Sequence, residues 1–244
     1  EAARQYGGKC FLRFDDTNPE KESAEYVAAL REDLAWLGLE FDEEHFSSDL
    51  MPAFYRYASG LVKSGDAYVC NCTKEAIAEN RFKKQACECR NNSVDKNWVL
   101  WEGMRNGETH KGEDILRLKA DLNSENTVMR DPTLFRIIET PHYRQKDKYV
   151  AWPTYDFEVS IADSLTGVTH ALRSKEYELR DELYYYIVEK CGLRKPVVYD
   201  FSRLNIHGTL LSKRFLKPLI EEKKVLGWDD PRLPTLQGLR RRGY

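Results

Sequence analysis

The stretch CFLRFDDTNPEKESAEYVAALREDLAWLGL, residues 10–39, places a short apolar strand directly before an amphipathic helix. Residues 10–14 are mostly apolar, as a short buried strand requires. We expect Asn18 to be the N-cap residue and Pro19 the first helical residue, because both residue types favour these positions. Spacings of three and four residues then define the inner face of the helix, which is Val27, Leu30, Leu34 and Leu37.

The same alternation of strand and helix recurs farther along the chain. A second amphipathic helix is expected from about Pro52, a strand at GVTHALR (167–173) and a helix at RDELYYYIVEKCGL (180–193). This pattern predicts an α/β fold with a parallel sheet. The first residues, EAARQYGG, look like a helix end closed by glycine, so we expect a strand and a loop to precede residue 1.

Residues 68–150 show a different sequence pattern. Trp98 and Trp101 lie at helical spacing, while residues 115–122 (ILRLKADL) and 134–138 (LFRII) alternate as strands do. An insertion with its own small antiparallel sheet is the simplest interpretation.

Composition excludes few functions. The 244 residues contain 38 Lys and Arg against 40 Asp and Glu, so a nucleic-acid partner would need a local basic patch. No apolar run reaches the roughly 18 residues of a membrane span. The patches Lys83–Arg90 and Arg240–Arg242 are candidates for phosphate contact, although most such charge runs are solvated surfaces.

Four of the six cysteines fall in CNCTKEAIAENRFKKQACEC, residues 70–89, as two Cys-x-Cys pairs. In an extended segment residues i and i+2 point to the same side, so each pair can present two thiolates to one ion. Four thiolates suit a closed, structural zinc site, with reduced and partly buried thiols as the alternative. The predicted metal ligands are Cys70, Cys72, Cys87 and Cys89.

Polar residues that follow strands are the first candidates for ligand binding, because ligands of open parallel sheets bind beyond the carboxyl ends of the strands. Helix capping is the alternative role for Asp15 and Asp16. The candidates are Asp15, Asp16, Tyr155, Asp156 and Arg173. Ser212, Lys213 and Arg214 on a second predicted loop place cations where they can cover a polyphosphate, or form a plain surface turn.

Several long strings resemble the catalytic region of the glutamyl/glutaminyl-tRNA synthetase family, in the right order and over nearly the whole chain. They are LRFDDTNPEKE, RNNSVDKN, MRDPTLFRI, WPTYDFEVSIADSLTGVTHALRSKEY, YDFSRLNIHGTLLSKR and GWDDPRLPTLQGLRRRGY. The resemblance implies a class I Rossmann-type α/β domain with an inserted α+β domain that binds the tRNA acceptor end. It divides the chain into catalytic residues 1–67, inserted residues 68–150, catalytic residues 151–197 and a lysine-motif loop with the start of a helical subdomain at 198–244.

The implied reaction is an ATP-dependent amino-acid activation followed by transfer to tRNA, with Mg²⁺ as the companion of ATP. The resemblance also implies a cytoplasmic enzyme, which we expect to be a monomer. Matching position by position, Asp15 receives the substrate ammonium group and Tyr155 lines the amino-acid pocket. LLSKR matches the family's mobile lysine motif, which gives Leu211, Ser212 and the catalytic Lys213, and Arg203 falls near the nucleotide. The family's His-x-Gly-His motif is not found in the sequence, and it normally precedes the LRFDDTNP strand.

Arg173 separates the two branches of the family. Glutaminyl enzymes typically have a cysteine at this position, whereas this sequence reads THAL followed by arginine, as the glutamyl branch does. A side-chain carboxylate in a dry pocket needs a fixed cation, and arginine offers it bidentate hydrogen bonds. We therefore expect a glutamate–tRNA ligase of the archaeal and eukaryotic type, with a glutamine–tRNA ligase or a non-catalytic tRNA-binding module as alternatives. The alternative is a purely structural role for Arg173, in an ion pair with Asp163 or Glu176.

Overall fold

The computed structural model describes residues 1–202 and 207–243. These residues form two compact units, each with its own internal contacts. The first unit comprises Glu1–Val27 and Phe41–Phe201, and the second comprises Ala28–Glu40 and Ser202–Tyr244.

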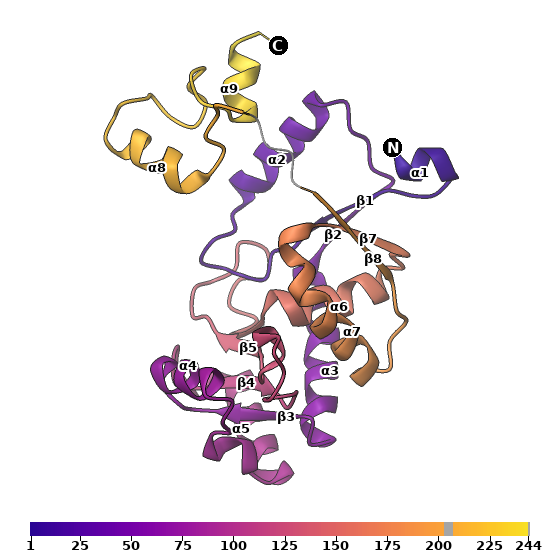
Figure 1. Cartoon of the computed structure of the whole chain (residues 1–244), viewed down its shortest axis with the longest axis vertical. Helices are drawn as coiled ribbons and strands as arrows, with labels where there is room; N and C mark the ends of the chain where they lie inside the picture. The colour runs from indigo at the N-terminus through magenta and orange to yellow at the C-terminus, as the bar shows by residue number, and fades with distance from the viewer. Residues whose placement is uncertain (203–206, 244) are drawn as a thin grey trace. The chain divides into compact units, whose positions relative to one another are not determined.

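Two parallel strand pairs carry the α/β part of the first unit. Strand β1 (Phe11–Phe14) pairs with β2 (Glu43–Phe46), and β7 (His170–Ser174) pairs with β8 (Val197–Phe201). Figure 1 shows both pairs near one end of this unit. The short helix α1 (Ala2–Tyr6) ends at Gly7, whose φ of 65° is the left-handed value that glycine adopts without strain. The predicted α/β class with parallel strands is confirmed.

A four-stranded antiparallel sheet forms the other end of the first unit. Its strands lie in chain order as β3 (Ala67–Cys70), β4 (Ile115–Leu118), β5 (Thr133–Ile137) and β6 (Ala151–Pro153). The sequence had predicted strands at 115–122 and 134–138, and the first of these is shorter in the structure. The division of the chain into two catalytic parts and an inserted domain stays a prediction.

Helices cover these sheets and supply most of the core. Helix α3 (Met51–Lys63) packs against α5 (Val94–Asn106), and α6 (Tyr155–Leu165) packs against α7 (Asp181–Lys190). Helix α4 (Lys74–Phe82) and four short 3₁₀ helices complete the first unit: η1 (Ser47–Leu50), η2 (Glu88–Asn91), η3 (Thr127–Met129) and η4 (Lys175–Arg180). The core includes Phe54, Trp101, Phe135, Trp152 and Phe157, all fully buried. Each such side chain contributes about 1.5–3 kcal/mol by leaving water.

The predicted start of helix α2 was wrong. The helix spans Ala24–Trp36. The backbone amides of residues 21 and 22 donate to the Asn18 carbonyl oxygen and form a separate turn, so the helix begins only after Ser23. The Ser23 hydroxyl accepts the Tyr26 amide at 3.3 Å, as an N-cap side chain does. Of the expected inner face Val27 is buried, while Leu30 and Leu37 are 50% and 46% exposed. Residues 28–40 belong to the second unit, so the expected inner face is divided between the two units.

The second unit is held by a small core and by ion pairs. Helix α8 (Lys213–Glu221) and α9 (Leu236–Arg241) frame a cluster of Leu216, Val225 and Leu233. Arg240 Nη1 lies 3.1 Å from Asp33 Oδ1 on α2. This contact joins the two chain segments that make up the unit.

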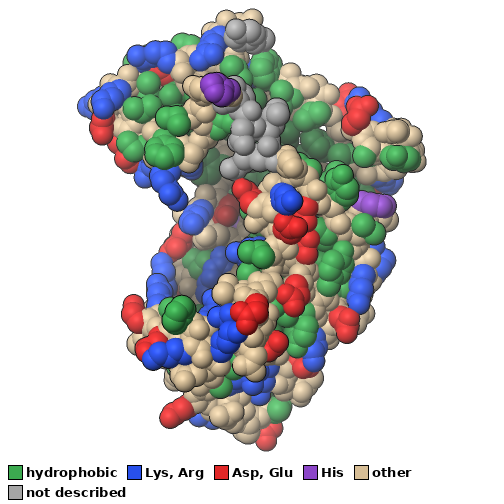
Figure 2. Space-filling model, in the orientation of Figure 1, with side chains coloured by type: hydrophobic (Ala, Val, Ile, Leu, Met, Phe, Trp, Pro, Cys, Tyr) green, Lys and Arg blue, Asp and Glu red, His purple; other side chains and the backbone are tan. Residues whose placement is uncertain are grey.

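The face of the first unit drawn in Figure 2 carries charges of both signs. Acidic and basic side chains are interspersed on the face of the first unit seen in Figure 2, which fits the near-balance of 38 basic and 40 acidic residues. Among the described residues, no helix combines the length and the apolar character that a membrane crossing requires.

Candidate functional site

The predicted site residues of the first unit come from three elements. Asp15 directly follows β1, Arg173 lies inside β7 near its carboxyl end, and Tyr155 is the first residue of α6. The arginine therefore belongs to the strand and does not follow it. Two further residues, Arg13 and Asp163, connect Asp15 with Arg173.

Arg13 ties the end of β1 to helix α6. Its Nε donates to Asp15 Oδ1 at 2.6 Å, and its Nη1 donates to Asp163 Oδ1. The Glu158 carboxyl also lies 3.9 Å from Arg13 Nε. A nearly buried guanidinium with several carboxylate partners fixes its neighbours firmly, because its N–H groups point in a rigid plane.

Asp163 is the common partner of the two arginines. Its second oxygen accepts hydrogen bonds from Arg173 Nη2 at 2.9 Å and from the Tyr184 hydroxyl at 3.1 Å. Arg173 is 7% exposed, and its Cζ lies over the Tyr184 ring, 4.2 Å from the centroid, with Asp181 Oδ1 3.8 Å from its Nη1. The scaffold pairing with Asp163 that the sequence left open is therefore present.

That pairing uses one N–H group of the guanidinium, and Asp181 Oδ1 lies beyond hydrogen-bond distance of Nη1, at 3.8 Å. In the part of the chain that the structure describes, only Nη2 of Arg173 donates a hydrogen bond to a carboxylate, out of five N–H groups. Stacking on a tyrosine and one carboxylate on one side hold the group still. An incoming anion can use the remaining donors without competing for Asp163.

Tyr155 lies within electrostatic reach of both ends of this network. Burial raises the pKa of its hydroxyl to about 12, Arg173 acts in the opposite direction, and Asp15 adds to the rise. Its ring packs on Tyr177 with 5.2 Å between centroids. The structure thus brings Asp15, Tyr155 and Arg173 to one region of the first unit.

Glu158 is a member of this cluster that the sequence reasoning missed. It is fully buried on α6, and burial followed by the nearby Asp15 charge raises the pKa of its carboxyl well above the usual value. Ser47 Oγ lies 2.5 Å from Glu158 Oε1 and 3.2 Å from Asp15 Oδ1. Because one hydroxyl hydrogen serves one acceptor, a protonated Glu158 can donate to Ser47, which then donates to Asp15. The signal in the sequence was a glutamate inside an otherwise apolar helix segment, flanked by Phe157 and Val159.

The two remaining candidates of this set have structural partners. Asp16 is 1% exposed and accepts the amide and hydroxyl of Ser48, each at 2.8 Å, and the Tyr143 hydroxyl at 2.9 Å. Asp16 therefore binds an amide of η1, and not one of the next helix, α2, for which the capping alternative proposed it. Asp156 accepts a hydrogen bond from Arg180, which fixes α6 to η4.

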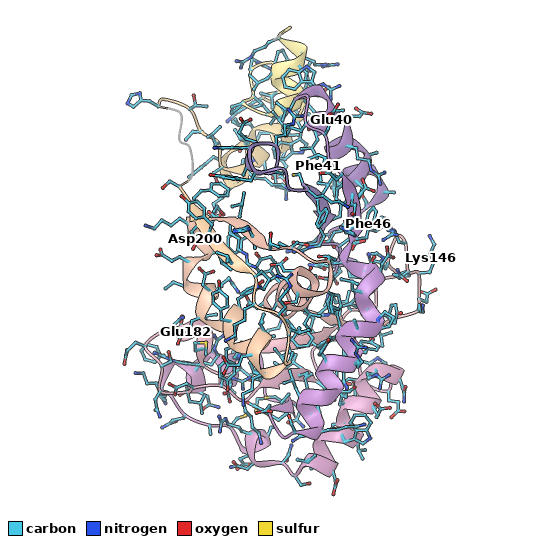
Figure 3. All side chains as sticks on the ribbon, turned by 90° about the vertical axis from the view of Figure 1, so that its right-hand side faces the viewer. Glu40, Phe41, Phe46, Lys146, Glu182 and Asp200 are labelled. Atoms are coloured by element: carbon cyan, nitrogen blue, oxygen red, sulfur yellow. The ribbon has the colours of Figure 1, made fainter. Side chains whose placement is uncertain are left out.

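A second carboxyl pair borders Arg173 on the β8 side. Burial and, next, the neighbouring Asp200 carboxyl raise the pKa of Asp181 to about 6. Asp200 lies on β8, where it is the register partner of Arg173 (Figure 3). The Arg173 guanidinium thus lies near two carboxyl groups, Asp163 and Asp181, and the pKa of Asp181 is raised.

The lysine motif lies in the second unit. Leu211 and Ser212 precede α8, and Lys213 and Arg214 are its first two residues, so the expected loop continues into a helix after Ser212. Lys213 Nζ lies 5.8 Å from the Trp228 ring centroid. Arg203 falls outside the described residues.

The four cysteines of residues 70–89 meet at one point. Their sulfur atoms lie within 4.8 Å of one another, with Cys70–Cys87 at 3.8 Å and Cys72–Cys89 at 3.9 Å. A tetrahedral Zn–S₄ unit with bonds of 2.3 Å has sulfur–sulfur distances of about 3.8 Å. The cluster can hold a metal ion, and all four thiols are free of disulfides.

The two basic patches are already engaged in ion pairs. Lys83 contacts Glu79, Lys84 contacts Glu125, and Arg90 contacts Asp131 in the first patch. In the second, Arg240 pairs with Asp33 and Arg241 pairs with Asp229. Their contact with RNA stays a prediction.

Parallel strands with Asp15 directly after one and a nearly buried arginine near the carboxyl end of another define an α/β protein with charged side chains where ligands of such sheets bind. A family model described as "tRNA synthetases class I (E and Q), catalytic domain" matches residues 1–244. The chain belongs to this family.

Curated relatives carry both specificities of the family. The chain is 54% identical to a glutamate–tRNA ligase of Nitrosopumilus maritimus over all of its residues, and 45% identical to a glutamine–tRNA ligase of Clostridium kluyveri over 99% of them. It covers 42% and 44% of those proteins, so it spans less than half of the relatives it matches.

A solved structure supports the fold. The glutamate–tRNA ligase of Elizabethkingia meningosepticum, solved in complex with its amino acid, superposes with a TM-score of 0.63 at 21% identity. It covers 87% of this chain and 47% of its own. At this identity the likeness concerns the fold alone.

Proposed function

We propose that this chain is the catalytic region of a glutamate–tRNA ligase. The observation that supports this choice is Arg173, a guanidinium held against Asp163 and Tyr184 with donors left for a second carboxylate. A glutamine side chain offers that guanidinium a neutral amide, which leaves a nearly buried charge poorly compensated. Discrimination of this kind amounts to a few kcal/mol.

In this proposal the amino acid is bound at three points. Asp15, whose side chain is 36% exposed, receives the ammonium group. Tyr155 lines the pocket between the two ends, and Arg173 pairs with the γ-carboxylate. Arg13 and Asp163 keep Asp15 and Arg173 at a fixed separation. The site would therefore favour an amino acid whose ammonium group and side-chain carboxylate are separated by the matching distance.

The reaction then follows in two balanced steps. An α-carboxylate oxygen of glutamate attacks the α-phosphorus of ATP, and pyrophosphate leaves with its electron pair. A ribose hydroxyl at the tRNA 3′ end next attacks the acyl carbon, its proton is released to solvent, and AMP leaves with the electron pair of the broken acyl–oxygen bond. We assign Lys213, with Ser212 and Leu211, and Arg203 to the nucleotide, where cations offset the charge that develops on pyrophosphate. Mg²⁺ would supply further neutralisation of the ATP phosphates.

We assign the four-cysteine cluster to a structural Zn²⁺. The sulfur spacing near 3.8 Å supports this, because it matches a tetrahedral tetrathiolate site. Four protein ligands leave no open position, so the ion would take no part in the chemistry. Its role would be to join the end of β3 to the segment that leads into η2.

The specific observation that favours a glutamine–tRNA ligase is the 45% identity to the clostridial enzyme. Pyrophosphate exchange by the full-length protein, with tRNA present, separates the two. We expect exchange with glutamate and little with glutamine. A preference for glutamine would reject the proposal, and exchange with neither would favour a non-catalytic tRNA-binding module.

The proposal also includes a monomeric state and a cytoplasmic location for the protein.

A further inference from the structure

The antiparallel sheet presents an arginine to the cysteine cluster. On β3 and β4, Val69 and Leu116 belong to the main core, whereas Tyr68 and its register partner Arg117 lie on the opposite face of the sheet with Cys70. Arg117 is 2% exposed. The register of β4 against β5 shifts between Leu116 and Arg117, and an irregularity of this kind can re-aim a side chain.

The guanidinium of Arg117 meets the two buried sulfur atoms of the cluster. Its Nη1 lies 3.8 Å from Cys70 Sγ and 3.8 Å from Cys87 Sγ, so it sits symmetrically beneath this pair. Its Nε donates to the Asp131 carbonyl oxygen at 2.9 Å, which anchors the group on the side away from the sulfurs.

Asp131 organises the rest of this support. It is 1% exposed, and its φ of 46° is a left-handed value that costs free energy for a residue with a Cβ. Its carboxylate accepts the Tyr68 hydroxyl at 3.0 Å, Arg90 Nε at 2.7 Å and the Ala120 amide at 2.9 Å. Since the Asp131 carboxylate is satisfied by these groups, the Arg117 charge is left to face the sulfurs.

We propose that Arg117 is a positioning residue of the metal site, which holds Cys70 and Cys87 in place and offsets part of the thiolate charge. The inference rests on the proposed zinc site. Four thiolates around Zn²⁺ leave two uncompensated negative charges in a largely buried place. A guanidinium in contact with two of the sulfurs removes one of these charges and satisfies sulfur lone pairs. Outer-shell groups of this kind typically change metal affinity 10–100-fold.

The alternative role of Arg117 is to fill the sheet face without any effect on the metal. Arg130 provides a matched control for this alternative. It is a buried arginine at 6% exposure in the same region, but its guanidinium donates to the carbonyl oxygens of Ser124 and Arg81 and not to a thiol. Loss of a buried arginine as such is thus separated from loss of the sulfur contact.

The experiment compares Arg117→Met, Arg117→Lys and Arg130→Met in the full-length protein. Zinc affinity is measured by chelator competition, and Co²⁺ substitution reports the sulfur-to-metal absorption of a tetrahedral site. We expect Arg117→Met to bind zinc 10–100-fold more weakly with tetrahedral cobalt bands retained. Arg117→Lys, which keeps the charge, should lie between it and the natural protein, and Arg130→Met should match the natural protein.

Each outcome has a distinct meaning. If both Arg117 variants bind zinc as tightly as Arg130→Met, Arg117 only fills the sheet and the inference is overturned while the zinc site stands. If the natural protein holds no zinc, both proposals fall. If Arg117→Met does not fold, the affinity of Arg117→Lys decides, with no loss counting against the inference.

Discussion

Asp163 accepts the Arg173 guanidinium at 2.9 Å on one carboxylate oxygen while its other oxygen binds Arg13. One nearly buried carboxylate on α6 therefore connects the two parallel strand pairs, since Arg13 lies on β1 and Arg173 on β7. The proposed contacts to the two ends of glutamate depend on this single side chain.

The first prediction concerns Asp163 itself. Asp163→Asn leaves two nearly buried guanidinium groups without their shared negative partner, so it should lower the free energy of unfolding by about 3–5 kcal/mol. Asp156→Asn is the control, because its partner Arg180 is 40% exposed and such a pair contributes about 1 kcal/mol or less. Denaturant unfolding measures both variants. Equal losses of unfolding free energy in the two variants would show that Asp163 stabilises the protein no more than an ordinary surface ion pair does.

The second prediction concerns Arg173. Arg173→Cys should raise the KM for glutamate about 30- to 150-fold, as expected for a lost charge-assisted contact of 2–3 kcal/mol, and leave the KM for ATP nearly unchanged. Steady-state pyrophosphate exchange in the full-length protein, with each substrate varied in turn, gives the two constants. An equal loss for both substrates would contradict a specific role toward the side-chain carboxylate.

The third prediction follows from the raised pKa of Asp181. The folded state holds this proton up to a pH of about 6 whereas an unfolded aspartate releases it near 3.8, so the folded state binds more protons between these values. This contribution to stability is present below pH 3.8 and is lost as the pH rises through 6. The asparagine of the Asp181→Asn variant has no proton to release, so this variant does not lose the stability as the pH rises. Between pH 4 and pH 7.5 the free energy of unfolding of Asp181→Asn should rise by about 1 kcal/mol relative to that of the natural protein. Urea unfolding at both pH values tests this, and parallel behaviour of the two proteins would refute it.

The fourth prediction concerns the metal. Purified protein should contain about one zinc ion per chain, and a strong chelator should lower the melting temperature, because metal-binding free energy adds to the stability of the fold. Cys87→Ser should abolish the metal, and Cys191→Ser, outside the cluster, should keep it. Metal analysis of the three proteins is sufficient, and zinc in Cys87→Ser equal to that of the natural protein would count against the site.

The fifth prediction uses two glycines with opposite surroundings. A Cβ on Gly60 of α3 meets nothing within 4 Å, so Gly60→Ala should stabilise the protein by about 0.5–1 kcal/mol. A Cβ on Gly238 of α9 would lie 2.6 Å from the Leu233 carbonyl oxygen and 2.7 Å from that of Asp230, so Gly238→Ala should destabilise its unit by about 1–3 kcal/mol. Thermal unfolding of both variants gives the signs, and the same sign for both would contradict the packing described.

The sequence by itself determined the α/β class, several of the helices and strands, and the cysteine cluster. These follow from local properties: apolar residues at a spacing of two or of three and four, glycine at helix ends such as Gly7 and Gly192, and Cys-x-Cys spacing in an extended segment. It also selected Asp15, Tyr155 and Arg173, which the structure gathers in one region. It failed at the start of α2, where Ser23 competes with Asn18 as the N-cap residue.

Only the tertiary structure decided which charges are partners. Arg13 and Asp163 are 150 residues apart, and nothing local marks them as a pair. The buried state of Glu158 and the placement of Arg117 under Cys70 and Cys87 likewise arise from contacts between distant segments. The reason is physical: the sequence records what each residue can do with its chain neighbours, whereas burial, pKa and ion pairing depend on what the fold packs against it.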